Sequence, residues 1–231
     1  FHYLALRNSA IGILMLHNKD TYIDEHLTRN LYKHSLLMSL SNLIFGAALV
    51  FLFMGLFDQT VMLRWIAVLV AFTTCRILGY VYFTRLLKLQ ESLTGPQNIH
   101  VLISFLLGCT YASAFAAIIW FSNASSWAPV LAVVIALSAW SSVMITSSFQ
   151  SSFCFNAPIL LATAIAVGIK MQPESFIIAG CLCLYLCIHT WAMYVQSATL
   201  KKLYAKQFDD QTHMAELERK LSTQKQLIIK D

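Results

Sequence analysis

The chain contains a long stretch with almost no formal charge, and this stretch limits the available folds more than any other feature. Between Lys88 and Lys170 the only charged residue is Glu91. Of the 231 residues, 12% are charged and 58% are hydrophobic, whereas soluble domains carry about 25% charged residues. Such a stretch would not stay dispersed in water, so we expect lipid to be its solvent and the chain to be an integral membrane protein.

Six apolar segments are long enough to cross a bilayer. A hydrocarbon core about 30 Å thick requires roughly 20 helical residues, and the backbone must be helical because lipid offers it no hydrogen-bond partner. We place the segments at 35–57, 61–83, 99–121, 127–146, 155–169 and 176–195. Pro158 is expected in the first turn of the fifth helix, where proline is tolerated. The predicted fold is all-α, an integral membrane six-helix bundle with a cytoplasmic coiled-coil extension.

The distribution of basic residues predicts the orientation. Lysine and arginine concentrate on the cytoplasmic side of membrane proteins. The segment before the first span, the loop between the second and third spans, and the tail carry Arg7, Lys19, Arg29, Lys33, Arg85, Lys88, Lys201, Lys202, Lys206, Arg219, Lys220, Lys225 and Lys230. The opposite side has only Arg64 and Lys170. Both termini are therefore predicted to be cytoplasmic, and this placement explains the net charge of +5 without nucleic acid as a partner.

The last segment is polar but retains a helical pattern. No glycine or proline follows Gln196, so the sixth span is expected to continue as a helix. Apolar residues recur at alternating spacings of three and four, as in a coiled-coil seam. We predict a parallel homodimer through Leu200, Leu203, Met214, Leu217, Leu221 and Ile228. The alternative is a single amphipathic helix that lies on the membrane or packs on another domain. The predicted domains are a cytoplasmic or interfacial segment 1–34, a membrane domain 35–195 and a signalling helix 196–231.

Four polar residues inside the spans are candidates for sensing a ligand. Arg76 lies within the second span, where a charge is costly and marks a functional site by default. It would pair with a lipid phosphate, an anionic ligand or backbone carbonyls, or its side chain would extend to the headgroups. Ser141 and Ser142 would line a cavity or allow close helix packing. His189 is a sensing residue, a hydrogen-bonded interior histidine or a residue near the cytoplasmic interface.

The cysteines of the sixth span are considered as metal ligands. Cys183 and Cys187 are four residues apart and share a helix face, as a soft Cu(I) site would require. The simpler interpretation is that they serve as small apolar residues in helix packing. We predict no cofactor. No phosphate-binding loop, zinc spacing or nucleophile elbow is found in the sequence.

The arrangement resembles the six-helix membrane sensor regions that precede histidine kinase or GGDEF diguanylate cyclase domains in bacterial signalling proteins. The resemblance covers residues 30–231. It rests on Leu31-Tyr-Lys-His34, Arg85-Leu-Leu-Lys88, Phe153-Cys-Phe-Asn-Ala-Pro158, Lys201-Lys-Leu-Tyr204 and Ala215-Glu-Leu-Glu-Arg-Lys-Leu221. It implies a multi-pass protein of the bacterial inner membrane that acts in a two-component or cyclic-dinucleotide system. No phosphoacceptor histidine motif or cyclase signature occurs before Asp231, so the output domain itself is not identified.

The short connections between spans restrict the signal. They cannot bind a bulky external ligand, so we expect a small or lipophilic molecule, a membrane property or membrane lipids themselves. The expected function is a sensory module that relays this signal through the sixth helix and the coiled coil to a cytoplasmic output domain. The alternative is a small multi-pass transporter or channel, although only Arg76 lies mid-span and no repeat is evident. Whether the protein is an enzyme depends on the output domain.

Overall fold

The computed structural model describes residues 19–52, 54–89, 94–122, 127–145 and 147–228. These ranges contain the helices α2 (Lys19–Lys33), α3 (Ser35–Leu52), α4 (Gln59–Leu89), α5 (Thr94–Phe121), α6 (Trp127–Met144), α7 (Phe149–Gly168) and α8 (Pro173–Ile228), and no named β-strand. Parts of several predictions lie outside the described residues. They are residues 1–18 of the N-terminal segment, Phe53 of the first span, Thr146 of the fourth span, residues 229–231 of the signalling helix and the side chain of Ile228.

The all-α prediction with six membrane spans is confirmed at the level of the helices. Six helical stretches in the described part of the chain are long and apolar enough to cross a membrane. They fall at Lys19–Phe51, Gln59–Leu86, Gln97–Phe121, Trp127–Met144, Phe149–Gly168 and Pro173–Lys225. The chain is therefore a multi-pass membrane protein. Its exposed surface agrees with this, since many large apolar side chains of α4 and α8 have no cover within the bundle.

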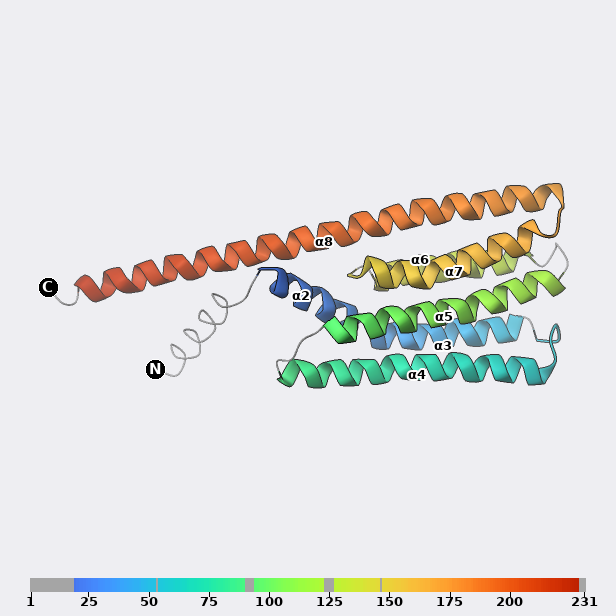
Figure 1. The fold of residues 1–231 in the computed structure, drawn as a ribbon, viewed down its shortest axis with the longest axis horizontal. Coiled ribbons are helices and arrows are strands. Elements are labelled where there is room, and N and C mark those ends of the chain that lie inside the picture. The colour runs from blue at the N-terminus through green and yellow to red at the C-terminus, as the bar shows by residue number, and fades with distance from the viewer. Residues whose placement is uncertain (1–18, 53, 90–93, 123–126, 146, 229–231) are drawn as a thin grey trace. The chain divides into compact units, whose positions relative to one another are not determined.

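The chain divides into two compact units, and the larger unit comprises residues 28–197. In it α3, α4, α5, α6 and α7 lie side by side (Figure 1), and α5 and α7 share the most extensive contact. α5 is central and carries the fully buried Leu107, Tyr111 and Phe115. The core is completed by Val130, Val134 and Leu137 of α6 with Phe155, Ile159 and Val167 of α7.

The contact between α5 and α7 depends on a glycine. A β-carbon added to Gly108 would collide with the carbonyl oxygen of Phe155 and lie 3.1 Å from that of Cys154. These neighbours are backbone atoms, so they cannot rotate away. Small residues permit such close approach of membrane helices. The site coincides with Pro158, which has no N–H to offer the carbonyl of Cys154 four residues earlier.

The prediction that Pro158 lies in the first turn of the fifth helix is wrong. α7 begins at Phe149, so Pro158 lies inside it. The early start has a local cause. Ser148 adopts an extended backbone and its side-chain oxygen accepts a hydrogen bond from the backbone N–H of Ser151, which caps the helix.

The smaller unit comprises residues 1–27 and 198–231, of which 19–27 and 198–228 are described. The first turns of α2 contact one face of α8. Lys19 Nζ lies 2.7 Å from Asp209 Oδ2, and the Tyr22 hydroxyl donates to Gln211 Oε1 at 3.2 Å. The rings of Tyr22 and Phe208 lie 5.1 Å apart. The ion pair is exposed and contributes little, so the aromatic contact is the stronger link.

Replacing Gly108 by alanine should destabilise the larger unit. The added methyl group collides with the backbone of α7, and overpacking of this kind costs about 1–3 kcal/mol. We expect a lower midpoint of thermal unfolding in detergent. The matched control is Gly180→Ala on α8, where an added β-carbon meets nothing within 4 Å and the midpoint should hold or rise. Equal midpoints for the two variants would contradict the close approach of α5 and α7.

Candidate functional site

Arg76 lies inside the larger unit with its side chain 1% exposed. Its Nη2 group donates to His100 Nε2 at 3.3 Å and to Ser104 Oγ at 3.1 Å. Both partners belong to α5 and are themselves buried. The guanidinium therefore points into the bundle. The Arg76 side chain does not extend toward the lipid headgroups, which was the alternative considered from the sequence.

His100 connects Arg76 to the first turn of α7. Because an arginine only donates, His100 Nε2 must accept, and the imidazole proton resides on Nδ1. Nδ1 lies 3.2 Å from Ser151 Oγ and donates to it. Ser151 Oγ also accepts from the Ser148 hydroxyl at 3.1 Å, so Ser151 retains its own O–H as a donor. We call Arg76, His100, Ser104, Ser148 and Ser151 the Arg76 cluster.

The order of the helices brings this cluster to one end of the bundle. Arg76 lies in the C-terminal half of α4, and the chain reverses between α4 and α5, which are in contact. His100 is in the second turn of α5 and Ser151 in the first turn of α7. Tyr32, near the end of α2, covers the cluster: its ring stacks on Phe83 at 4.2 Å and meets His100 edge-on at 5.5 Å.

The guanidinium of Arg76 is only partly satisfied. Its Nε and Nη1 atoms are buried and have no hydrogen-bond partner among the described residues. The helices α4, α5, α6 and α7 contain no aspartate or glutamate. A buried charge without a counter-charge costs several kcal/mol. Three N–H donors and one positive charge thus remain uncompensated by these helices, and this distinguishes the Arg76 cluster from a packing contact.

The other three predicted sensing residues form a separate hydrogen-bonded network. The Ser141 hydroxyl lies 2.8 Å from Asn156 Oδ1, and Ser142 Oγ lies 3.0 Å from His189 Nε2. Asn156 in turn donates from Nδ2 to the carbonyl oxygen of Ser152 at 3.0 Å. These bonds join α6 to α7 and to α8. Each of the three residues has a protein partner, so the network fits helix association better than ligand binding.

Cys183 and Cys187 lie four residues apart on α8. Both thiols are exposed on α8. Within the described ranges, no three or more histidine, cysteine, aspartate or glutamate side chains are grouped so that they would hold a metal ion.

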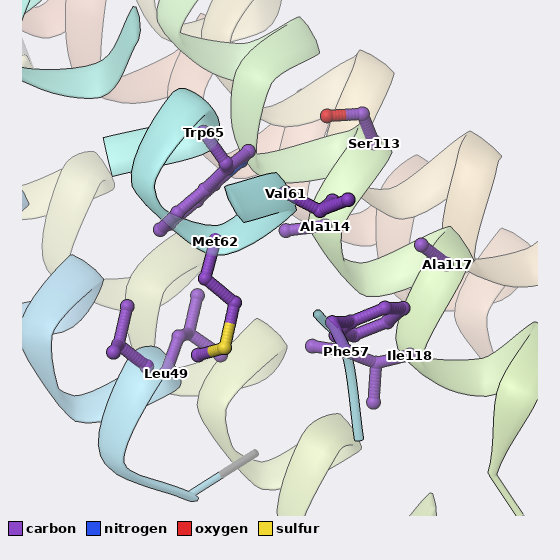
Figure 2. A pocket seen from close by; sticks show the side chains of 10 residues that line it. Leu49, Phe57, Val61, Met62, Trp65, Ser113, Ala114, Ala117 and Ile118 are labelled. Atoms are coloured by element: carbon purple, nitrogen blue, oxygen red, sulfur yellow. The ribbon is translucent and has the colours of Figure 1, made fainter. Parts of the chain in front are cut away.

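An apolar cavity of about 270 Å³ lies at the other end of α4. Figure 2 shows Leu49 of α3, Val61, Met62 and Trp65 of α4, and Ser113 of α5 around it. Its polar groups are already used, since the Ser113 hydroxyl and the Trp65 indole N–H both donate to the carbonyl oxygen of Thr110. Ligand sites combine apolar walls with a few free polar groups. The cavity lacks the latter, so the Arg76 cluster is the better candidate site.

No protein-family model, curated protein or solved structure matches this chain. The resemblance to bacterial six-helix sensor regions therefore remains an expectation. The function must follow from the side chains and helices described above.

The sequence prediction identified Arg76 but not its partners. His100 and Ser104 were missed, although their spacing of four residues places them on one helix face. Ser148 and Ser151 have the spacing of a helix cap, and this spacing was a second sequence signal that would have placed Ser151 at the start of a helix.

The contact between Arg76 and His100 should appear as an energetic coupling. His100→Leu leaves a buried Nη2 donor without its acceptor and should lower stability by about 1–3 kcal/mol. The double variant Arg76→Met/His100→Leu should lose less than the sum of the single variants, because it removes both polar partners. Thermal unfolding in detergent measures this cycle. Thr74→Ala on the exposed face of α4 is the control and should not couple to His100. If the stability losses of the Arg76→Met and His100→Leu variants simply add in the double variant, the contact between the two side chains is excluded.

Proposed function

We propose that the chain is a membrane-embedded sensory module that relays a small, lipophilic or membrane-borne signal to a cytoplasmic output domain, either a histidine kinase or a diguanylate cyclase. The observation that supports this most is α8, a single helix of 56 residues from Pro173 to Ile228. Its first part is an apolar span in the larger unit, and its second part is polar and belongs to the smaller unit. A movement of the span would therefore reach the smaller unit without crossing a loop.

The polar part of α8 has two faces with different surroundings. Tyr204, Phe208 and Gln211 meet the start of α2 within the smaller unit. The predicted seam lies on a different side, displaced by one residue or about 100° around the helix. On that side Leu203, Met214, Leu217 and Leu221 are each at least 43% exposed. The contact with α2 thus leaves the seam side uncovered.

We propose that a second copy of the chain covers this seam. Apolar residues with alternating spacings of three and four pack against an identical helix in a parallel coiled coil. Four exposed large apolar side chains in a polar helix are costly in water, and pairing with an identical helix would bury them. Output domains of the proposed kind act as dimers across such a seam, and a change in helix register is a two-state element suited to switching.

The orientation and location follow the same proposal. Cytoplasmic termini place the basic tail of α8 and the Arg76 end of the bundle on the cytoplasmic side of a bacterial inner membrane. Lys170, in the turn before α8, would then lie at the outer end. It donates to the carbonyl oxygen of Trp120 at 2.6 Å, and tryptophan is enriched at membrane interfaces.

A charge introduced in the seam should separate the two copies. Leu217→Glu and Leu221→Glu place carboxylates opposite one another in the proposed coil, so we expect a dimer in the wild type and monomers in the variants. Light scattering coupled to size exclusion in detergent measures the mass. The matched control is Thr223→Glu, which adds the same charge at an exposed position outside the seam and should remain dimeric.

A monomeric wild-type chain, or seam variants that stay dimeric, would contradict the proposed dimer. A variant truncated after Gln196 distinguishes dimerisation through the polar part of α8 from dimerisation through the membrane helices. If the truncated chain is still a dimer, the membrane helices rather than α8 hold the two copies together.

A further inference from the structure

We propose that the Arg76 cluster is a binding site for the carboxylate group of a small or lipid-derived anion. The guanidinium presents three N–H donors, one on Nε and two on Nη1, that have no partner in the described part of the chain. Nη2 is already committed to His100 and Ser104. The guanidinium is thus held in place by one nitrogen while the other two remain available.

The positive charge of Arg76 needs a negative partner from outside α4, α5, α6 and α7, and Glu91, which follows α4, lies outside the described residues. None of these helices carries a carboxylate. The nearest acidic residue before Arg76 in the sequence, Asp58, precedes α4 by one residue, and the helical rise places it about 27 Å away along the axis. Glu174 lies at the start of α8, after the C-terminal end of α7 and so at the far end from Ser151. An anion that binds here would neutralise the guanidinium and accept its free donors.

The surroundings of Arg76 favour an anion. Ser151 has its own O–H to donate, because its oxygen accepts from His100 and Ser148. It lies in the first turn of α7, a helix of 20 residues whose N-terminus carries a partial positive charge. The unpartnered guanidinium, the serine donor and the helix N-terminus therefore all favour negative charge at the same place.

A carboxylate fits this site better than a phosphate. The cluster carries one positive charge, which a carboxylate balances, whereas a phosphate monoester brings about two negative charges. A phosphodiester has the correct charge but substituents on two sides. Arg76, His100, Ser104 and Ser151 are each at most 2% exposed, so the site suits a group that enters from one side. A carboxylate has a single substituent, and its plane matches that of the guanidinium.

Gly79 marks where such a group would enter. It lies three residues after Arg76 and so near the same face of α4. A β-carbon added to Gly79 would meet only the hydroxyl oxygen of Tyr32, at 4.0 Å. Gly79 is half-buried, whereas the residues of the Arg76 cluster are buried. A larger side chain at this position would narrow the approach without a clash with the backbone.

The role of this site as the receiver of the signal rests on the proposed sensory function. The binding of a carboxylate can be measured whether or not that function is correct. The probes are oleate and acetate, each labelled with ¹³C at the carboxyl carbon. The protein is the whole chain in nanodiscs of uncharged phosphatidylcholine. The carboxyl resonance is followed during titration. Oleate tests a source in the membrane and acetate a source in water.

Three variants make the titration specific. Arg76→Gln removes the charge and should weaken binding by about tenfold or more. Gly79→Val leaves the guanidinium intact and should also weaken binding, so the proposal remains testable if Arg76→Gln does not fold. Arg64→Gln is the matched control on the same helix, where the arginine is exposed, and should bind as the wild type does.

Saturable binding of either probe that depends on Arg76 and Gly79 but not on Arg64 supports the site. Binding of oleate alone indicates a lipid-derived ligand, and binding of acetate alone indicates a water-borne ligand. Binding of both probes indicates that the site recognises the carboxylate itself. Absence of saturable binding, or equal loss in Arg64→Gln, overturns the proposal. Binding of inorganic phosphate in place of both probes overturns the choice of carboxylate. If binding occurs but the chain is monomeric, the site stands and the proposed relay through α8 fails.

Discussion

The hydrocarbon of a bilayer offers no hydrogen-bond partner, and the rest of this structure follows from that constraint. It requires helices, because only they satisfy their own backbone groups. It also explains how the polar side chains inside the larger unit are placed. Ser39, Thr73 and Thr163 each donate to the carbonyl oxygen four residues earlier, at 2.8, 2.7 and 2.6 Å. Others join helices, as the Trp140 indole N–H does with Ser41 Oγ at 2.8 Å. Several buried polar atoms nevertheless have no hydrogen-bond partner among the described residues, including both side-chain polar atoms of Asn42, and of these atoms the nitrogens of Arg76 carry a charge.

Two arrangements give the Arg76 cluster its form. The close approach of α5 and α7 at Gly108 aligns the second turn of α5 with the first turn of α7, so that His100 and Ser151 meet. The reversal between α4 and α5 then brings Arg76 to the same end. The rigid contact lies in the middle of the bundle, while the polar cluster lies toward its end, where Tyr32 of α2 covers it.

The sequence was sufficient for the six apolar spans but not for α2 as a separate helix or for the site. Long apolar runs predict spans because length and hydropathy are properties of the segment itself. The start of α7 was misplaced because Pro158 resembles a helix-opening residue, whereas the cap at Ser148 decides the boundary. Arg76 was identified from the cost of an intramembrane charge. His100 was missed because its spacing from Ser104 indicates a shared helix face but not the residues that meet it, and these become clear only when α4, α5 and α7 converge. The contact of Tyr22 with Phe208 was equally inaccessible, since residues far apart in the sequence make it.

The central claim is that occupancy of the bundle is passed through α8 to a pair of chains, and the most direct test is the distance between the two copies of α8. A spin label attached through a non-natural amino acid at Thr223 avoids the six native cysteines, and pulsed electron paramagnetic resonance in nanodiscs gives the distance distribution. We predict a defined distance between copies that shifts when oleate or acetate is added, and that no longer shifts in Arg76→Gln. Absence of any distance between labels, or a distribution that is unchanged by ligands shown to bind, would contradict the account.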